Sequence, residues 1–240
     1  MEDPTDVSIR DPEPTISSAA VAYDDLGLRY EAAFTAAPAR FRSLDWLVLE
    51  LSSRKAHSDG GTPKILDIGC GTGKPTARTL ADAGFRVYGI DVSPKMIELC
   101  QQQVPEGKFA VADARTWEPP HGKESYDAIT VYFSLILDVA QSDIRLVIER
   151  VHEWLAPGGL FLFATVPMEG ENVRTKFMGH DVTVSNLSAE ASVEAIKDAG
   201  FTVVKQEFAN YMPDAEKAGL KKEDVEEESE LFVYACKRSG

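Results

Sequence analysis

The chain has 240 residues, 44% of them hydrophobic and 27% charged, which is typical of one soluble globular domain with a sizeable core. Its 39 acidic and 25 basic residues give a net charge of −14, which repels phosphate backbones, so we expect no nucleic-acid partner. The 3 cysteines show no pattern that predicts a disulfide framework or a zinc site. The acidic N-terminus does not resemble a signal peptide, and no apolar run is long enough to span a membrane, so we expect a cytoplasmic protein without membrane contacts.

The N-terminal region divides into two parts. Residues 1–17 are rich in proline and acidic residues, a composition that predicts a disordered lead. From about residue 18 to residue 54 the pattern is helical, with apolar residues at three- and four-residue spacing, and residues 58–63 predict a turn. An acidic segment near the C-terminus is interpreted as a solvated loop, and it holds Glu223, Asp224, Glu226, Glu227, Glu228 and Glu230.

From residue 64 onward the pattern alternates between short apolar runs and helical periodicity. Helices are predicted over 75–83, 93–104, 142–155 and 188–199, with Ser93 and Ser142 as N-caps and with Pro157-Gly158-Gly159 as a turn that ends the third. Strands are predicted over 65–68, 87–90, 109–112, 128–133, 160–166, 201–208 and 231–236. This alternation predicts an α/β fold with a mostly parallel sheet and helices on both faces.

The turn after the first of these strands is the most informative stretch. Asp67 ends an apolar run, and Gly69, Gly71 and Gly73 follow at alternate positions before a helix. This strand, glycine-rich turn and helix predict a site for a nucleotide-type cofactor. A dinucleotide fingerprint is G-x-G-x-x-G, but here Lys74 stands where its third glycine belongs. A carboxylate at Asp67 would repel a pyrophosphate and would suit a cationic ammonium group.

Further motifs follow in chain order. They are Gly89-Ile90-Asp91-Val92-Ser93, Val111-Ala112-Asp113-Ala114, Tyr126-Asp127-Ala128-Ile129 leading to Tyr132, and Leu155-Ala156-Pro157-Gly158-Gly159-Leu160. Together with the glycine-rich turn, they resemble the S-adenosylmethionine-dependent methyltransferases of the Rossmann-like class, of the small-molecule type. The resemblance is close over residues 65–166 and looser beyond. It implies a doubly wound, mostly parallel seven-stranded sheet with the last strand antiparallel and an N-terminal helical lid.

The resemblance also implies a division of the chain and a set of cofactor contacts. Residues 18–240 would form the methyltransferase domain, with a helical cap at 18–56, a cofactor-binding half at 64–166, and a substrate-side loop and C-terminal strands at 167–240. Asp67 would contact the methionine ammonium group, Asp91 the ribose hydroxyls and Asp113 the adenine amine. The full set of implied S-adenosylmethionine contacts is Tyr23, Tyr30, Asp67, Gly69, Cys70, Gly71, Gly73, Asp91, Val92, Met96, Asp113, Ala114 and Tyr132.

Some of these residues also have structural interpretations. Asp67 and Asp91 would serve as helix caps, and Asp113 would be an acid in a turn. Cys70 lies between two glycines and needs no reactivity to be explained. Tyr23, Tyr30 and Phe34 share one helical face, which predicts either packing on the core or a lid over the cofactor.

The acceptor side of the site is less well defined by the sequence. Residues 167–187 are too many for a simple connection, so we expect a functional loop there. It contains His180, the best candidate for a general base. An exposed loop histidine without a catalytic role is the favoured interpretation, and in-line transfer by positioning needs no base. No spaced cluster of His, Asp or Glu predicts a metal site.

The sequence therefore predicts transfer of a methyl group from S-adenosylmethionine to an O, N or S atom of a small apolar or neutral molecule. Secondary metabolism is indicated by the resemblance alone. Three alternatives remain open: methylation of a protein side chain, a cofactor-binding regulatory or scaffold protein without activity, and a non-methylating enzyme that uses the sulfonium electrostatically. The fourth strand lacks the Asn/Asp-Pro-Pro-aromatic signature of the exocyclic-amine methylases of nucleic acid.

Overall fold

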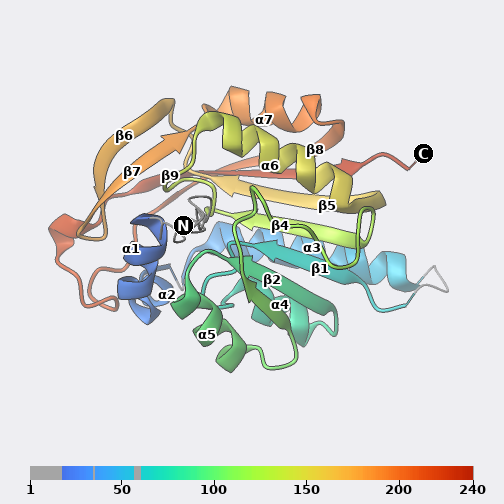
Figure 1. Cartoon of the computed structure of the whole chain (residues 1–240), viewed down its shortest axis with the longest axis horizontal. Helices are drawn as coiled ribbons and strands as arrows, with labels where there is room; N and C mark the ends of the chain where they lie inside the picture. Colours follow the sequence, from blue (N-terminus) through green and yellow to red (C-terminus); the bar gives the residue numbers. More distant parts are fainter. Residues whose placement is uncertain (1–17, 35, 57–60, 240) are drawn as a thin grey trace, which may run out of the picture.

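The computed structural model describes residues 18–34, 36–56 and 61–239. The predicted disordered lead at 1–17 and the first part of the predicted turn at 58–63 lie outside the described residues. Within the described part, alternating helices and strands build one large sheet with a small hairpin beside it (Figure 1).

The large sheet has seven strands in the order β3-β2-β1-β4-β5-β9-β8. The strands β1 to β5 pair in parallel, and β9 is antiparallel to both β5 and β8. The predicted mostly parallel sheet with an antiparallel last strand is thus confirmed, and its strand order reverses between β1 and β4. The bounds are β1 Lys64–Ile68, β2 Arg86–Asp91, β3 Lys108–Val111, β4 Tyr126–Tyr132, β5 Leu155–Thr165, β8 Phe201–Tyr211 and β9 Glu228–Lys237.

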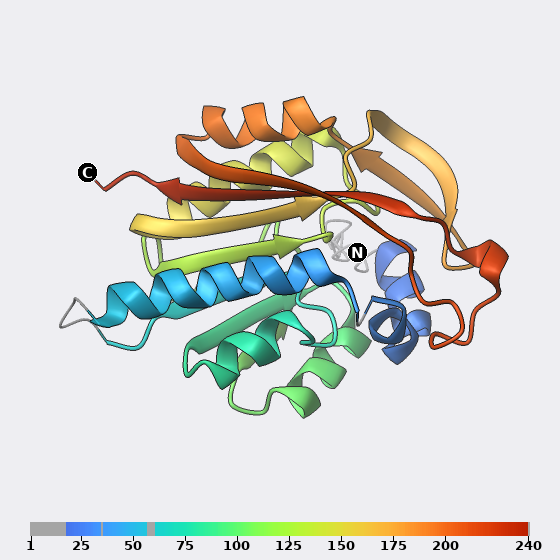
Figure 2. The same ribbon diagram turned by 180° about the vertical axis from the view of Figure 1, so that it is seen from behind.

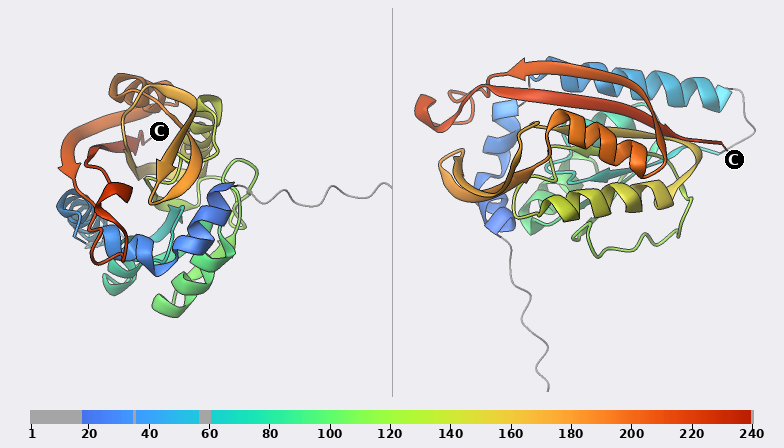
Figure 3. Two further views of the ribbon diagram at one scale, coloured as in Figure 1. Left: turned by 90° about the vertical axis from the view of Figure 1, so that its left-hand side faces the viewer. Right: turned by 90° about the horizontal axis from the view of Figure 1, so that it is seen from above.

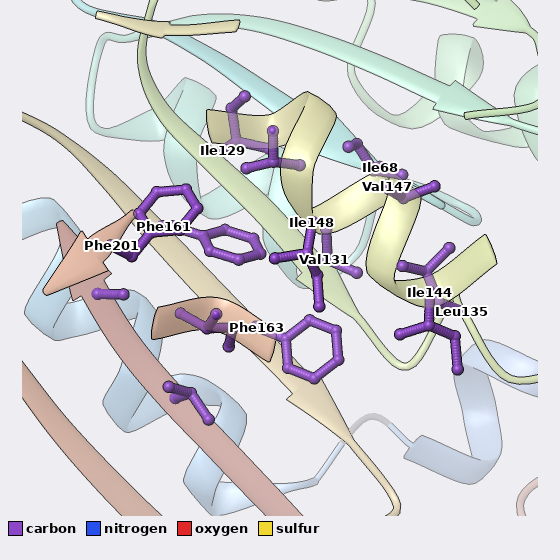
Figure 4. Close-up of a cluster of buried hydrophobic side chains, with 14 of the residues drawn as sticks. Ile68, Ile129, Val131, Leu135, Ile144, Val147, Ile148, Phe161, Phe163 and Phe201 are labelled. Carbon is purple, nitrogen blue, oxygen red and sulfur yellow. The ribbon is translucent and has the colours of Figure 1, made fainter. Parts of the chain in front are cut away.

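Helices cover both faces of the sheet because alternate strand residues point to opposite sides. In β1, Ile65 packs toward one core, whereas Leu66 and Ile68 pack toward the other. Figure 2 shows one face covered by α3 (Pro38–Ala56), α4 (Thr76–Asp82) and α5 (Pro94–Gln103). The other face carries α6 (Gln141–Trp154) and α7 (Ala189–Asp198), and Figure 4 shows the side chains buried beneath α6.

Four segments gather at the end of the sheet where the parallel strands terminate (Figure 1 and Figure 3). They are α1 (Ser18–Leu26), α2 (Leu28–Phe34), the antiparallel hairpin of β6 (Gly170–Phe177) and β7 (His180–Asn186), and the stretch at 212–227, which includes η1 (Lys222–Asp224). The expected loop at 167–187 is therefore largely a hairpin. Its alternate residues Val182 and Val184 pack against Ala19 and Ala22 of α1, which gives the hairpin an apolar face to bury.

Three local expectations were wrong. Helix α6 begins at Gln141, not at Ser142, and the carboxylate of Asp143 accepts the N–H of Ala140 in front of it (3.1 Å). Pro157-Gly158-Gly159 was expected to form a turn, but it lies within β5. At this place the pairing register between β4 and β5 shifts, so the three residues form an irregular part of the strand.

The third error concerns the acidic segment. Glu228 and Glu230 are the first and third residues of β9 instead of belonging to a solvated loop, and Glu230 is only 2% exposed. Their alternation places them on the same face of the strand as Phe232 and Tyr234, which pack toward α3.

Candidate cofactor and acceptor site

The glycine-rich turn after β1 departs from ordinary backbone geometry. Gly69 and Gly71 have φ angles of 69° and 54°, in the left-handed region that glycine adopts without strain. A Cβ atom on Gly69 would lie 2.0 Å from the Cβ of Ser134, so only glycine allows the turn to approach the end of β4. A Cβ atom on Gly71 would meet nothing within 4 Å. Gly71 therefore leaves open space beside the turn.

That space belongs to a cavity of about 800 Å³ at the carboxyl ends of β1, β2 and β4, with α1 and α2 on its far side. Most of the predicted cofactor residues line it. They are Tyr23, Tyr30, Gly69, Gly71, Asp91, Val92, Met96, Asp113, Ala114 and Tyr132. We call this space the first cavity.

Asp91 ends β2 and holds its carboxylate in the wall of the first cavity. One oxygen accepts the N–H of Gly71 and the other accepts the N–H of Ser93, each at 2.9 Å. Burial raises the pKa of Asp91, and these two N–H donors partly offset that rise. Ser93 itself caps α5 by accepting the N–H of Met96 (3.0 Å). Asp91 is thus held rigidly, and each oxygen keeps a lone pair for a ligand hydroxyl.

Asp113 faces the same cavity but has a strong internal partner. Its two oxygens accept from the Arg115 guanidinium at 2.6–3.0 Å, and one also accepts the Arg115 backbone N–H (2.9 Å). Burial raises the pKa of Asp113, but the Arg115 contacts outweigh it and the pKa is lowered overall. The interpretation of Asp113 as an acid in a turn is therefore supported, while its place in the cavity wall leaves the adenine contact as a prediction.

Asp67 is brought close to the cavity without lining it. The side chain is 2% exposed, and its carboxylate accepts a hydrogen bond from the hydroxyl of Thr130 (2.7 Å). Burial raises the pKa of Asp67 to about 7, against the opposing effects of Thr130 and Arg40. A buried carboxylate of this kind gains from a nearby cation, so the predicted contact with an ammonium group remains a prediction that the electrostatics favour.

Two predicted contacts are directed away from the cavity. Cys70 and Gly73 both pack against Cys100 of α5. A hydrogen bond with Cys100, together with burial, raises the pKa of the Cys70 thiol. The thiol stays protonated near neutral pH, so packing explains Cys70 without any reactivity.

The N-terminal aromatic residues pack together as one of their two interpretations expects, while their role as a lid over the cofactor stays a prediction. Tyr23 and Tyr30 stack edge to face with ring centroids 5.5 Å apart, and Phe34 lies 5.0 Å from Tyr30. Phe177 of the hairpin lies 6.3 Å from Tyr23. The same tyrosines line the first cavity, so they form a packed cluster and a wall of the site at once.

A second cavity of about 670 Å³ lies on the other side of these tyrosines. Tyr23, Tyr30, Phe133 and Leu137 line both cavities. The remaining wall comes mainly from the hairpin and the ends of β5 and β9, and it consists of Phe34, Ile136, Val166, Met168, Thr175, Lys176, Phe177, Val184, Asn186 and Glu228.

His180, the predicted general base, is not among the residues that line either cavity. It begins β7, and its Nε2 lies 3.2 Å from the carboxylate of Asp25. This contact between the hairpin and α1 gives His180 a structural explanation, and its catalytic role remains an untested prediction.

The sequence analysis missed Arg40. This arginine at the start of α3 is only 6% exposed, and its guanidinium carbon lies 5.4 Å and 5.2 Å from the ring centroids of Tyr132 and Phe133. Its Nε is buried without a hydrogen-bond partner. A lone arginine in a helix is not a motif, so only the tertiary structure reveals a buried cation here.

The sequence analysis also gave no structural role to Asp138. Its carboxylate accepts from the hydroxyl of Ser18 and the N–H of Ala19 (2.6–2.7 Å), and so it holds the first turn of α1 against the loop after β4. The two partners are about 120 residues apart in the chain, so no local pattern could have indicated this contact.

Comparison with known proteins agrees with this geometry. Residues 65–159 match the model of a methyltransferase domain family. A methyltransferase dependent on S-adenosylmethionine from Methanosarcina mazei superposes with a TM-score of 0.62 at 17% identity, covering 75% of this chain and 95% of that one. Residues 65–159 thus resemble a methyltransferase domain, and the chain shares the Rossmann-like fold of S-adenosylmethionine-dependent methyltransferases.

Other relatives and structural neighbours resemble the chain to different extents. An O-methyltransferase of Penicillium expansum is 26% identical over 167 residues, which are 67% of this chain and 59% of that protein. The structure of a [4+2]-cyclase superposes with a TM-score of 0.65 at 19% identity and covers 95% of this chain and 99% of that one, which shows the shared fold. The chain spans between about a third and half of the length of the curated relatives it matches first.

The described residues also bear on metal sites and on membrane spans. No group of three or more His, Cys, Asp or Glu side chains there is placed to hold a metal ion, and the predicted independence from metal remains to be tested. In the same part of the chain, no helix combines the length and the apolar character that crossing a membrane requires.

Proposed function

We propose that this chain binds S-adenosylmethionine in the first cavity and transfers its methyl group to a small molecule in the second. The observation that carries this proposal is the wall that the two cavities share, made of Tyr23, Tyr30, Phe133 and Leu137. The two cavities adjoin where the strand order of the sheet reverses, which is the usual ligand position in this architecture.

The residues of the first cavity fit the proposed cofactor. Gly71 leaves room where any side chain would intrude, and Asp91 offers two oxygens to a vicinal diol. Asp67 and Arg40 do not line this cavity, but both are buried and they influence each other electrostatically, and together they would complement the ammonium and carboxylate ends of an amino acid. When bound, the cofactor supplies a methyl group already activated by its sulfonium.

The second cavity supports a small, largely apolar acceptor. Its lining is mainly aromatic and aliphatic, as is usual for sites that bind small organic molecules. Holding such an acceptor in line with the methyl group supplies most of the catalysis that a displacement of this type requires. The apolar lining of the second cavity does not by itself distinguish O, N and S as the acceptor atom. The name of the Penicillium O-methyltransferase supports oxygen.

The proposal keeps the division of the chain into a helical cap at 18–56, a cofactor-binding half at 64–166 and an acceptor side at 167–240. It also keeps a cytoplasmic location and a small-molecule partner, which rest on composition and on the apolar second cavity. The proposed location and the proposed partner are independent of each other.

The test is incubation with methyl-labelled S-adenosylmethionine and a panel of small alcohols, amines and thiols, read by mass spectrometry. We expect a labelled product with an equal amount of S-adenosylhomocysteine. Asp91→Ala should weaken binding of S-adenosylhomocysteine by about 1.5–3 kcal/mol, because charge-assisted hydrogen bonds are lost. Conversion of an acceptor without label, or binding without any transfer, would favour the non-methylating alternatives.

A further inference from the structure

Glu228 is the only carboxylate among the described residues that line the second cavity. It opens β9 and lies across this cavity from the hairpin, whose Thr175 and Lys176 also line it. Unlike those of Asp91 and Asp113, its carboxylate accepts no hydrogen bond from a described residue, so the carboxylate oxygens are free to accept one from a ligand.

Titratable and charged groups approach Glu228 from several elements, and Tyr211 of β8 pairs with it in the sheet. Glu230 lies on the same strand, Tyr23 and Tyr30 approach from α1 and α2, and Arg40 approaches from α3. The pKa of Glu228 is raised to about 7, mainly by burial and further by the charge of Glu230, while Arg40 opposes both effects. Burial also raises the pKa of both tyrosines, so they stay neutral when Glu228 ionises. Lys176 is the other charged residue of the cavity wall.

We propose that Glu228 is the acceptor-side base of the transfer and that the acceptor is a neutral hydroxyl compound with an apolar body. This inference rests on the proposed function and narrows it to one substrate class and one further catalytic residue. Glu228 lines the proposed acceptor cavity and would take the proton of the acceptor hydroxyl. His180, the base predicted from the sequence, lines neither cavity.

The chemistry of the second cavity selects the hydroxyl. An ammonium ion would carry its charge into an apolar cavity, and Glu228 would stabilise that ion instead of freeing its lone pair. A carboxylate acceptor would face the charge of Glu228. A thiol ionises near neutral pH without help. A hydroxyl enters uncharged and needs a base only at the moment of transfer.

The step balances without any further reagent. The acceptor oxygen forms a bond to the methyl carbon while the bond between that carbon and sulfur breaks. The electron pair of the broken bond stays on sulfur, which becomes the neutral thioether of S-adenosylhomocysteine. The hydroxyl proton passes to the carboxylate of Glu228 and later leaves to solvent. The second product is a methyl ether.

The experiment measures label transfer from methyl-labelled S-adenosylmethionine to 2-naphthol between about pH 5 and about pH 9. The unaltered chain should show a rate that rises through about pH 7. Glu228→Gln should lose roughly 100-fold at pH 8 and show no inflection, while Glu228→Asp recovers part of the rate. 2-Naphthoic acid, with the same ring system and a carboxylate, should not be methylated.

Glu230→Gln is the matched control. It removes an acid of the same strand whose pKa is also raised to about 7 but which does not line the cavity. It should keep the plateau rate and move the inflection to lower pH, because it removes a charge that raises the pKa of Glu228.

Three results would overturn the proposal. They are an unchanged pH profile in Glu228→Gln, an equal loss in Glu230→Gln, and no transfer to 2-naphthol by a chain that binds S-adenosylhomocysteine. If S-adenosylhomocysteine itself fails to bind, it is the proposed function that has failed, so the two failures are distinguishable.

Discussion

The first and second cavities share a wall, but they are built in different ways. In the first cavity, polar side chains are held by hydrogen bonds from the backbone, as when Asp91 accepts the N–H groups of Gly71 and Ser93. In the second, apolar side chains come from α1, α2, the hairpin and the ends of β5 and β9, which are far apart in sequence. The difference indicates that the cofactor side is preorganised by the sheet, whereas the acceptor side depends on tertiary packing at the lid end.

The largest effect should come from the backbone of the first cavity. Gly69→Ala adds a Cβ atom 2.0 Å from that of Ser134 at a φ of 69°, so we expect a loss of about 3 kcal/mol or more in the free energy of unfolding. Gly71→Ala is the matched control, since its Cβ meets nothing within 4 Å, and it should cost about 1–2 kcal/mol while obstructing the cofactor. Urea unfolding measures both, and equal losses would mean that the turn does not depend on close approach.

The next effect concerns Asp67 and pH. Its pKa is about 7 in the folded chain, and the cofactor's ammonium group should lower it, so binding below pH 7 must release a proton. The affinity for S-adenosylhomocysteine should therefore rise with pH up to about 7, by at most about tenfold per unit. Calorimetry in two buffers of different ionisation enthalpy counts the protons. The same pH dependence in Asp67→Asn would assign the proton to another group.

A smaller effect is expected in the strand that closes the second cavity. The pKa of Glu230 is raised from 4.5 to about 7 by burial, so folding takes up a proton between these values. The contribution of Glu230 to stability is therefore greatest below about pH 4.5 and falls as pH rises to about 7. Glu230→Gln should raise stability at pH 8 by about 1–2 kcal/mol and change it little at pH 4. Thermal unfolding at the two pH values tests this, and a loss of stability at pH 8 would contradict it.

The smallest effect on stability should come from the contact that holds α1. Asp138→Ala removes the acceptor for Ser18 and Ala19 and should cost about 1 kcal/mol, as loss of a helix cap does. The cofactor and acceptor sides should both bind more weakly, because α1 contributes Tyr23 to both cavities. Unfolding and ligand titration together measure this. A change in stability without a change in binding would make α1 a packing element only.

The two cavities also differ in how far the sequence could predict them. The strands, the glycine-rich turn and the three acids near strand ends follow local rules of periodicity and backbone geometry, so the sheet and most of the first cavity were predictable. Residues 167–187 were expected to form a functional loop because they are too many for a simple connection, whereas they form a hairpin whose Val182 and Val184 pack against α1.

Arg40 and Glu228 show why the rest was missed. Each is an ordinary charged residue in its local context, and Glu228 follows a run of exposed acids. Only the pairing of β9 with β5 and β8 and the packing of α3 bring these two residues together beside the tyrosines.

The central claim is that the first cavity is a site for S-adenosylmethionine. Titration calorimetry of the unaltered chain with S-adenosylhomocysteine, and separately with NAD, tests it most directly. We expect micromolar binding of S-adenosylhomocysteine at one site per chain and no heat with NAD, because Asp67 and the G-x-G-x-G turn disfavour a pyrophosphate. Binding of NAD with no response to S-adenosylhomocysteine would contradict the account.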